Sequence, residues 1–236
     1  MFAAGAWPPC ETWSISRYQE LEDGGGPSPL RSAVTPWGLP HLAKRDLDQV
    51  RLANLLLQVS LTFGLELLIR GGSAFIEHPA FLEWHTERGA TSIWKLPEML
   101  ALVSHPDASL ITFEQSKLGA RSRKPTTLLL VRLEGFHSAF AANQVRGPSA
   151  PLQVLTGCDE TGAFRTLAAK EYPPRMNRVI AEALVAQASS IARSRRYRPV
   201  VLAESTLDVY MKSFVPLDPY LQVDIGADCA LFNRST

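Results

Sequence analysis

The sequence feature that most constrains the fold is a long amphipathic segment, residues 44–69, which leads directly into a short apolar one. Leucine, valine and phenylalanine recur through it near the 3.6-residue spacing of a helix, and Gly71-Gly72 follows as a stop signal. The next seven residues, 73–79, have the composition of a buried strand ended by proline. A long helix followed at once by a buried strand indicates an α/β protein.

The rest of the chain alternates between the same two kinds of pattern. Residues 1–7 are expected to be the tail of a strand. Further strands are expected at 109–115 and at 126–133, and further helices at 93–105 and 174–192. Residues 134–151 are expected to form a polar connection, and the Gly- and Pro-rich residues 21–43 a long exposed loop. This order predicts a mostly parallel sheet with helices packed on it. In such sheets chemistry gathers in the loops after the carboxyl ends of the strands.

Composition sets the domain organisation and excludes several classes of protein. The 236 residues are 46% hydrophobic and 20% charged with a net charge of +1, which fits one globular domain and excludes both an acidic solvating protein and a uniformly basic nucleic-acid coat. We expect one α/β domain over residues 1–192. Residues 193–236 are expected to be a basic segment, with four arginines between 193 and 198, and a weakly patterned tail.

Cysteine use and apolar runs bear on metal binding and location. The three cysteines are Cys10, Cys158 and Cys229. They form no CxxC pair, which excludes a zinc site of the usual spacing, and their odd number favours a reducing compartment. The longest apolar run, 61–69, is broken by Glu66, so no membrane span is expected. Residues 1–7 lack a basic segment and are too short for a signal peptide, so none is expected. The sequence thus predicts an intracellular protein without a metal and does not separate nucleus from cytoplasm.

Four motifs, in order along residues 8–192, carry a resemblance to a known family. The loop Pro8-Pro9-Cys10-Glu11-Thr12-Trp13-Ser14 resembles the Pro-Pro-Cys-Gln-x-Phe-Ser loop of DNA cytosine-5 methyltransferases. Residues 75–79, Phe-Ile-Glu-His-Pro, are similar to the family's strand ending in Glu-Asn-Val. Residues 115–124 are similar to its Gly-x-Pro-Gln-x-Arg-x-Arg motif, and residues 164–192 to its last two motifs. Divergent methyltransferase-like domains of retroelement- and phage-related proteins resemble the chain more closely still.

The resemblance implies an incomplete Rossmann-like sheet of the class I methyltransferase type with flanking helices, S-adenosylmethionine as cofactor and DNA as partner. Cys10 is implied to add to C6 of cytosine, which makes C5 nucleophilic, while Glu77 protonates N3 and Arg121 or Arg123 steadies the base carbonyl or a phosphate. The further residues implied to bind substrate are Pro9, Ser14, His78 and Lys124. The target base must leave the duplex to reach such a site.

The chain departs from the family pattern in ways that keep other functions open. His78 replaces the family's Asn and Glu11 its Gln, and the connection 134–163 is short for a target-recognition domain. Only nine residues precede Cys10, so the Gly-rich cofactor turn is not found and the cofactor-binding residues are unassigned. An upstream chain segment is one expected partner that would complete the sheet. Two alternatives stand beside a catalytic half-domain: a non-catalytic module binding nucleic acid or protein, and an inactive fragment of a larger polyprotein.

Overall fold

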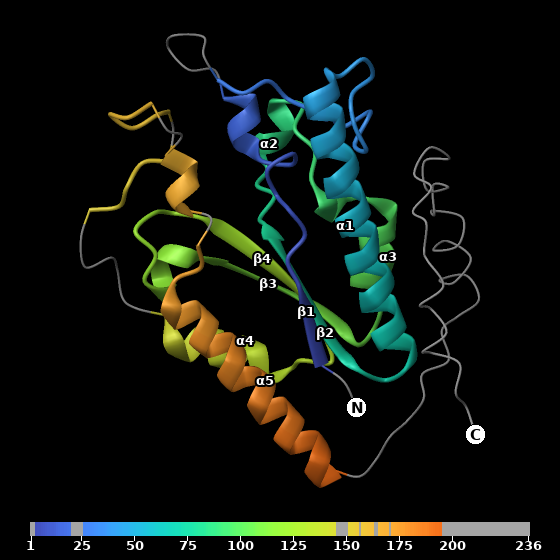
Figure 1. Ribbon diagram of the computed structural model, residues 1–236. Coiled ribbons are helices and arrows are strands. Elements are labelled where there is room, and N and C mark those ends of the chain that lie inside the picture. The colour runs from blue at the N-terminus through green and yellow to red at the C-terminus, as the bar shows by residue number, and fades with distance from the viewer. Residues whose placement is uncertain are drawn as a thin grey trace, which may run out of the picture.

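The computed structural model describes residues 3–19, 26–144, 151–155, 157–162, 165–169 and 171–194. Its centre is a four-stranded mixed sheet built from β1 (Ala3–Ala6), β2 (Ser73–Pro79), β3 (Ala108–Glu114) and β4 (Pro125–Val131) in the order β1-β2-β4-β3 (Figure 1). The predicted basic segment and tail fall almost wholly outside the described residues, so the boundary near residue 193 stays a prediction.

Strand direction only partly follows the sequence prediction of a mostly parallel sheet. β1 pairs parallel with β2, whereas β4 pairs antiparallel with both β2 and β3, so two of the three pairings are antiparallel. β1, β2 and β3 therefore run in one direction, with β4 inserted between two of them in the opposite direction. The connection from β3 to β4, residues 115–124, is too short for the crossover that a parallel neighbour requires.

Helices cover both faces of this sheet. On one face lie α1 (Lys44–Ile69) and α3 (Pro97–Val103), and on the other lie α4 (Gly135–Asn143) and α5 (Pro174–Ser194) (Figure 1). The period of two along β2 sends Ile76 into the α1 side and Phe75 into the α4 and α5 side. The sheet therefore separates two apolar cores, as in other α/β proteins.

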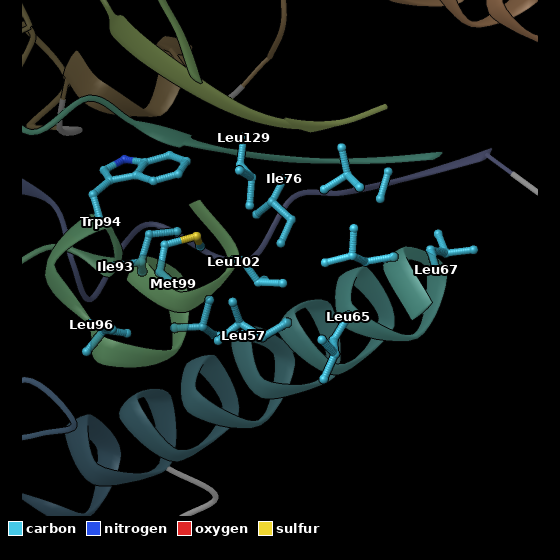
Figure 2. Packing of buried hydrophobic residues seen from close by; sticks show 14 of the residues in the cluster. Leu57, Leu65, Leu67, Ile76, Ile93, Trp94, Leu96, Met99, Leu102 and Leu129 are labelled. Carbon is cyan, nitrogen blue, oxygen red and sulfur yellow. The ribbon is translucent and has the colours of Figure 1, made fainter. Parts of the chain in front are cut away.

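The α1 core shows why the amphipathic pattern of residues 44–69 forms a helix with these bounds. Figure 2 shows Leu57 and Leu65 of α1 and Leu102 of α3 in the same cluster as Ile76 and Leu129 of the sheet. The helix ends at Ile69. Gly71, two residues later, has a φ of 69° in the left-handed region, and the Gly72 N–H closes the turn on the Leu67 carbonyl at 2.7 Å. The predicted helix is confirmed with the same bounds.

α1 is also the one helix among the described residues that is long and apolar enough to cross a membrane. Its inner side packs on β2 and α3, as a core helix does. Its outer side carries a stripe of exposed apolar side chains, Leu52, Leu56, Val59 and Phe63. Packing on the sheet therefore explains the apolar residues of the inner side of α1 and not those of the exposed stripe.

Three other sequence predictions need correction. The helix expected at 93–105 is a 3-10 turn, Ile93–Lys95, followed by α3, because Pro97 lacks an N–H and starts a new helix at its first position. The polar connection 134–151 contains α4, whose Phe136 and Phe140 are spaced four apart and buried. The loop 21–43 is not simply exposed, because Arg31 is buried against α1.

The remaining described elements are short. They are the 3-10 turns Ile15–Tyr18, Gln115–Leu118 and Arg165–Ala169 and the single-turn helix α2 (Trp84–Glu87). The strands expected at 109–115 and 126–133 are present with shifts of one or two residues, and α5 extends the expected helix 174–192 to Ser194.

Candidate active site

The candidate site lies where β1 and β2 end at the same edge of the sheet. The parallel register pairs Ala6 with Ile76, so the chain that follows each residue emerges at one carboxyl edge. Glu77 is the residue after Ile76, and Cys10 lies in the loop that follows β1. The register therefore brings to one edge the two residues that the family resemblance implies as nucleophile and acid.

Glu77 is buried on the α5 side of β2, with 4% of its surface exposed. The Tyr172 hydroxyl donates a hydrogen bond to its Oε2 atom, and its Oε1 atom has no hydrogen-bond partner among the described residues. Burial raises the pKa of the Glu77 carboxyl, and the Tyr172 hydrogen bond and the Lys124 charge oppose this rise only in part. The carboxyl is therefore biased toward the protonated form that can donate a proton.

Lys124, which immediately precedes β4, supplies the positive charge of the site. Its Nζ donates to the Ala169 carbonyl at 3.0 Å and lies 5.1 Å from the centre of the Tyr172 ring. Its charge lowers the pKa of both Glu77 and Cys10. Lys124 thus ties the chain before α5 to the sheet edge and favours negative charge there.

Cys10 is a half-buried free thiol. Burial raises its pKa, and so do the charges of Glu77 and Glu11, while Lys124 counteracts the rise. At neutral pH the thiol is therefore protonated, and it must lose this proton before it can act as a nucleophile. Because their charges act on one another, we treat Cys10, Glu77, Lys124 and Tyr172 as one group and call it the Cys10–Glu77 cluster.

The loop that carries Cys10 is held by its own turn and by a buried arginine. The Trp13 N–H donates to the Cys10 carbonyl at 3.0 Å, and the Ser14 hydroxyl caps the next 3-10 turn at the Ser16 N–H. Arg31, with 0% exposure, donates from Nε and Nη2 to Thr12 Oγ1 at 3.1 and 2.9 Å. These contacts fix the backbone on the carboxyl side of Cys10.

Within the described part of the chain, the guanidinium of Arg31 is satisfied without a carboxylate. Besides Thr12 it donates to the Pro36 carbonyl and to Asn54 Oδ1, both at 2.8 Å, and it stacks 3.9 Å above the Trp13 ring. Burial lowers the pKa of Arg31 to about 9, which leaves it charged at neutral pH. We call Arg31 with Thr12, Trp13 and Asn54 the Arg31 cage.

The structure places the other predicted site residues outside the Cys10–Glu77 cluster. Ser14 caps a turn, and Pro9 is half-buried beside Cys10. Arg121 and Arg123 are exposed in the loop before β4, where the Gln153 N–H donates to the Arg121 carbonyl at 2.7 Å. These two arginines therefore lie where a phosphate could reach them.

His78 lies on the opposite face of the sheet from Glu77. Successive residues of a strand point to opposite faces, and the His78 ring packs edge-on 6.5 Å from Trp94 in the α1 core. Neither ring nitrogen has a hydrogen-bond partner among the residues that the structure describes. Burial lowers the pKa of His78 to about 3, against a smaller opposing effect of the Pro79 carbonyl. The structure does not bring His78 to the substrate side with Glu77.

The sequence analysis missed Tyr172 and Arg31 as site residues. Tyr172 stands before Pro173-Pro174, which opens α5, so its position in front of a helix was visible but its partner was not. Arg31 sits among glycines and prolines, where no periodic pattern indicates burial.

The described residues do not fit a binding site for S-adenosylmethionine. The glycine in β1, Gly5, provides no cradle, because a Cβ there would lie 2.2 Å from the Phe75 ring that fills the space. Among the described residues no group of three or more His, Cys, Asp or Glu side chains could hold a metal ion.

Comparisons with family models, with curated proteins and with solved structures find no match for this chain.

Proposed function

We propose that this chain is the base-activating half of a DNA cytosine-5 methyltransferase-type domain, in which Cys10 adds to C6 of an extruded cytosine and Glu77 protonates N3. The observation that carries the proposal is that a thiol and a buried carboxyl with a raised pKa, from positions 10 and 77, converge at one edge of the sheet. The insertion of antiparallel β4 between β2 and β3 supports it, because class I methyltransferase sheets have an antiparallel strand in this region.

The addition step follows from the charges of the Cys10–Glu77 cluster. The thiol proton leaves to solvent, the sulfur forms a bond to C6, and N3 takes the proton of Glu77. The electron pair of the former C5–C6 double bond then makes C5 nucleophilic. Lys124 favours the thiolate that attacks C6 and the Glu77 carboxylate that the step leaves behind, since its charge lowers the pKa of each group.

Reversal of this addition gives a signature that needs no methyl donor. In D₂O the nucleophilic C5 takes a deuteron, the original C5 proton then leaves, and elimination of the thiolate restores the aromatic ring. The net result is exchange of the C5 hydrogen for deuterium with no change in oxidation state. Exchange of the C5 hydrogen therefore tests the proposal, because the described residues can perform this step without a methyl donor.

DNA is the proposed partner because the side chains of Arg121 and Arg123 are exposed and can contact phosphate. Both arginines closely precede Lys124 of the cluster in the sequence. A base must be unstacked to reach a carboxyl as buried as Glu77, so single-stranded DNA is the preferred substrate for a test. The outer edge of β1 is unpaired within the described residues, which fits an additional chain segment that would complete the sheet and the cofactor site.

The test incubates the protein in D₂O with a single-stranded oligonucleotide that contains one deoxycytidine and follows its mass. We expect exchange with the wild type and with Cys158→Ala, a matched control that removes an exposed thiol. Cys10→Ala abolishes it, and Glu77→Gln slows it by at least about 100-fold. Equal exchange by Cys10→Ala refutes the proposal. Salt-sensitive DNA binding without exchange by the wild type favours the non-catalytic binding module instead.

A further inference from the structure

The feature behind this inference is the unequal environment of the two oxygens of Glu77. Oε2 accepts the hydrogen bond of the Tyr172 hydroxyl, whereas Oε1 is buried and has no partner among the described residues. A buried polar atom without a partner is costly and calls for an explanation. In a carboxyl with one oxygen that accepts a hydrogen bond and one oxygen without a partner, the acid proton has a defined position on the second oxygen.

We propose that Tyr172 is a positioning residue that fixes the proton of Glu77 on Oε1, the oxygen presented to N3 of the base. This inference rests on the proposed function and deepens it. A tyrosine hydroxyl has one proton to donate, and here that proton is directed at Oε2. Oε2 then acts as the acceptor in both states of the carboxyl, and the acid proton of Glu77 resides on Oε1.

The position of Tyr172 is determined by elements on both sides of it. The Pro173 carbonyl, one residue later, accepts the Asn177 N–H at 3.2 Å in the first turn of α5, and Met176 of that turn is fully buried in the core. On the other side Lys124 holds the Ala169 carbonyl and lies over the ring of Tyr172. The hydroxyl is thus presented to Glu77 by a rigid helix start, which is what positioning requires.

The direction of the hydrogen bond agrees with the ionisation of the groups that face Glu77. These groups are Tyr172, Lys124 and Cys10. Burial and the negative charge of Glu77 raise the pKa of Tyr172, so the phenol keeps its proton and remains a donor. When Glu77 releases its proton, the same hydrogen bond stabilises the carboxylate, and Lys124 adds to this effect.

The first test needs no DNA and follows Glu77 directly. The protein is labelled with ¹³C at the glutamate carboxyl carbons, its spectrum is titrated with pH, and the Glu77 signal is assigned by its loss in Glu77→Gln. Tyr172→Phe keeps the ring and removes the hydroxyl. If Tyr172 donates, the Glu77 midpoint rises by about one pH unit in this variant. An unchanged or lower midpoint overturns the assignment, because a hydroxyl that accepts from Glu77 gives a lower one.

The second test measures the C5 exchange of the same variant against pH. We expect Tyr172→Phe to slow exchange by about 10-fold and to move the alkaline limb of the profile upward together with the Glu77 midpoint. A merely structural role lowers the rate without moving that limb, and this result overturns the inference. If Tyr172→Phe does not fold, 3-fluorotyrosine at position 172, a stronger donor, must move the Glu77 midpoint downward instead.

The two proposals fail in different ways. A wild-type protein without exchange refutes the proposed function, and the catalytic meaning of Tyr172 with it. A wild type with exchange and a Tyr172→Phe variant with the same rate and profile refutes only the role of Tyr172.

Discussion

The Arg31 cage gives the sharpest test of how the Cys10 loop is held, through the substitution Thr12→Val. Valine has nearly the shape of threonine but no hydroxyl, so Thr12→Val keeps the packing of a side chain that is 1% exposed and removes one oxygen. That oxygen accepts two hydrogen bonds from the buried guanidinium, at 3.1 and 2.9 Å. The substitution therefore leaves two donors of a buried charge unsatisfied.

The magnitude follows from the cost of unmade hydrogen bonds. Each unsatisfied buried donor costs about 1–3 kcal/mol, so Thr12→Val is expected to lower the free energy of unfolding by about 2–6 kcal/mol. Thr12→Ser is the matched control, because it keeps the hydroxyl and loses only a methyl group, at a cost of about 1 kcal/mol. The difference between these two variants isolates the contribution of the two hydrogen bonds from that of packing.

Urea unfolding monitored by tryptophan fluorescence measures both variants, with the slope of the transition compared to exclude a change in the unfolded state. The loop is followed separately by the rate at which iodoacetamide alkylates Cys10 in a protein whose other two cysteines are replaced by serine. We expect Thr12→Val to be alkylated faster than Thr12→Ser, since the turn after Cys10 loses its anchor. Equal stability and equal alkylation of the two variants would refute the view that Arg31 secures this loop.

Three further predictions concern the sheet and α1. Gly5→Ala is expected to destabilise the protein by about 1–3 kcal/mol, because the new methyl group meets the Phe75 ring at 2.2 Å, and Phe75→Leu should rescue part of this loss in a double-mutant cycle. Burial lowers the pKa of His78 to about 3, so between pH 6.5 and 3 the unfolded chain binds more protons at this residue than the folded chain does. The free energy of unfolding should therefore fall by about 2 kcal/mol from pH 6.5 to 5. Urea unfolding of the His78→Phe variant should lack this part of the decline. Leu57→Ala should cost about 2–5 kcal/mol whereas Val59→Lys stays within about 0.5 kcal/mol, as thermal unfolding in buffer can show; a large loss with Val59→Lys would mean that the outer side of α1 is covered in solution.

Long elements with a strong period could be predicted from the sequence, and short ones could not. α1 and α5 have several turns of regular apolar spacing, so their existence follows from amphipathicity alone. α4 has two buried phenylalanines and begins at a glycine, too little pattern to separate it from a loop. The antiparallel direction of β4 follows from the short connection between β3 and β4. The length of this connection is visible in the sequence, but the prediction of a mostly parallel sheet did not take it into account.

The site shows the same division. That Cys10 and Glu77 share an edge follows once both preceding strands are recognised and paired in parallel. That His78 points away from Glu77 also follows from the strand assignment, since neighbours on a strand face opposite ways, and including both in one site was inconsistent with it. The exposure of Arg121 and Arg123 agrees with either a phosphate contact or a solvated loop, so their role stays a prediction.

By itself the sequence determined where the long helices and the strands run, and which thiol and carboxyl follow strand ends, because helix and strand periods are local properties of the chain. Only the tertiary structure decided that Tyr172 meets Glu77 and that Arg31 closes over Thr12 and Trp13. Those partners are 95 and 19 positions apart for the two hydrogen bonds, and no local pattern records them. The physical reason is that a buried hydrogen bond is chosen by how helices and loops pack on the sheet, which no single segment specifies.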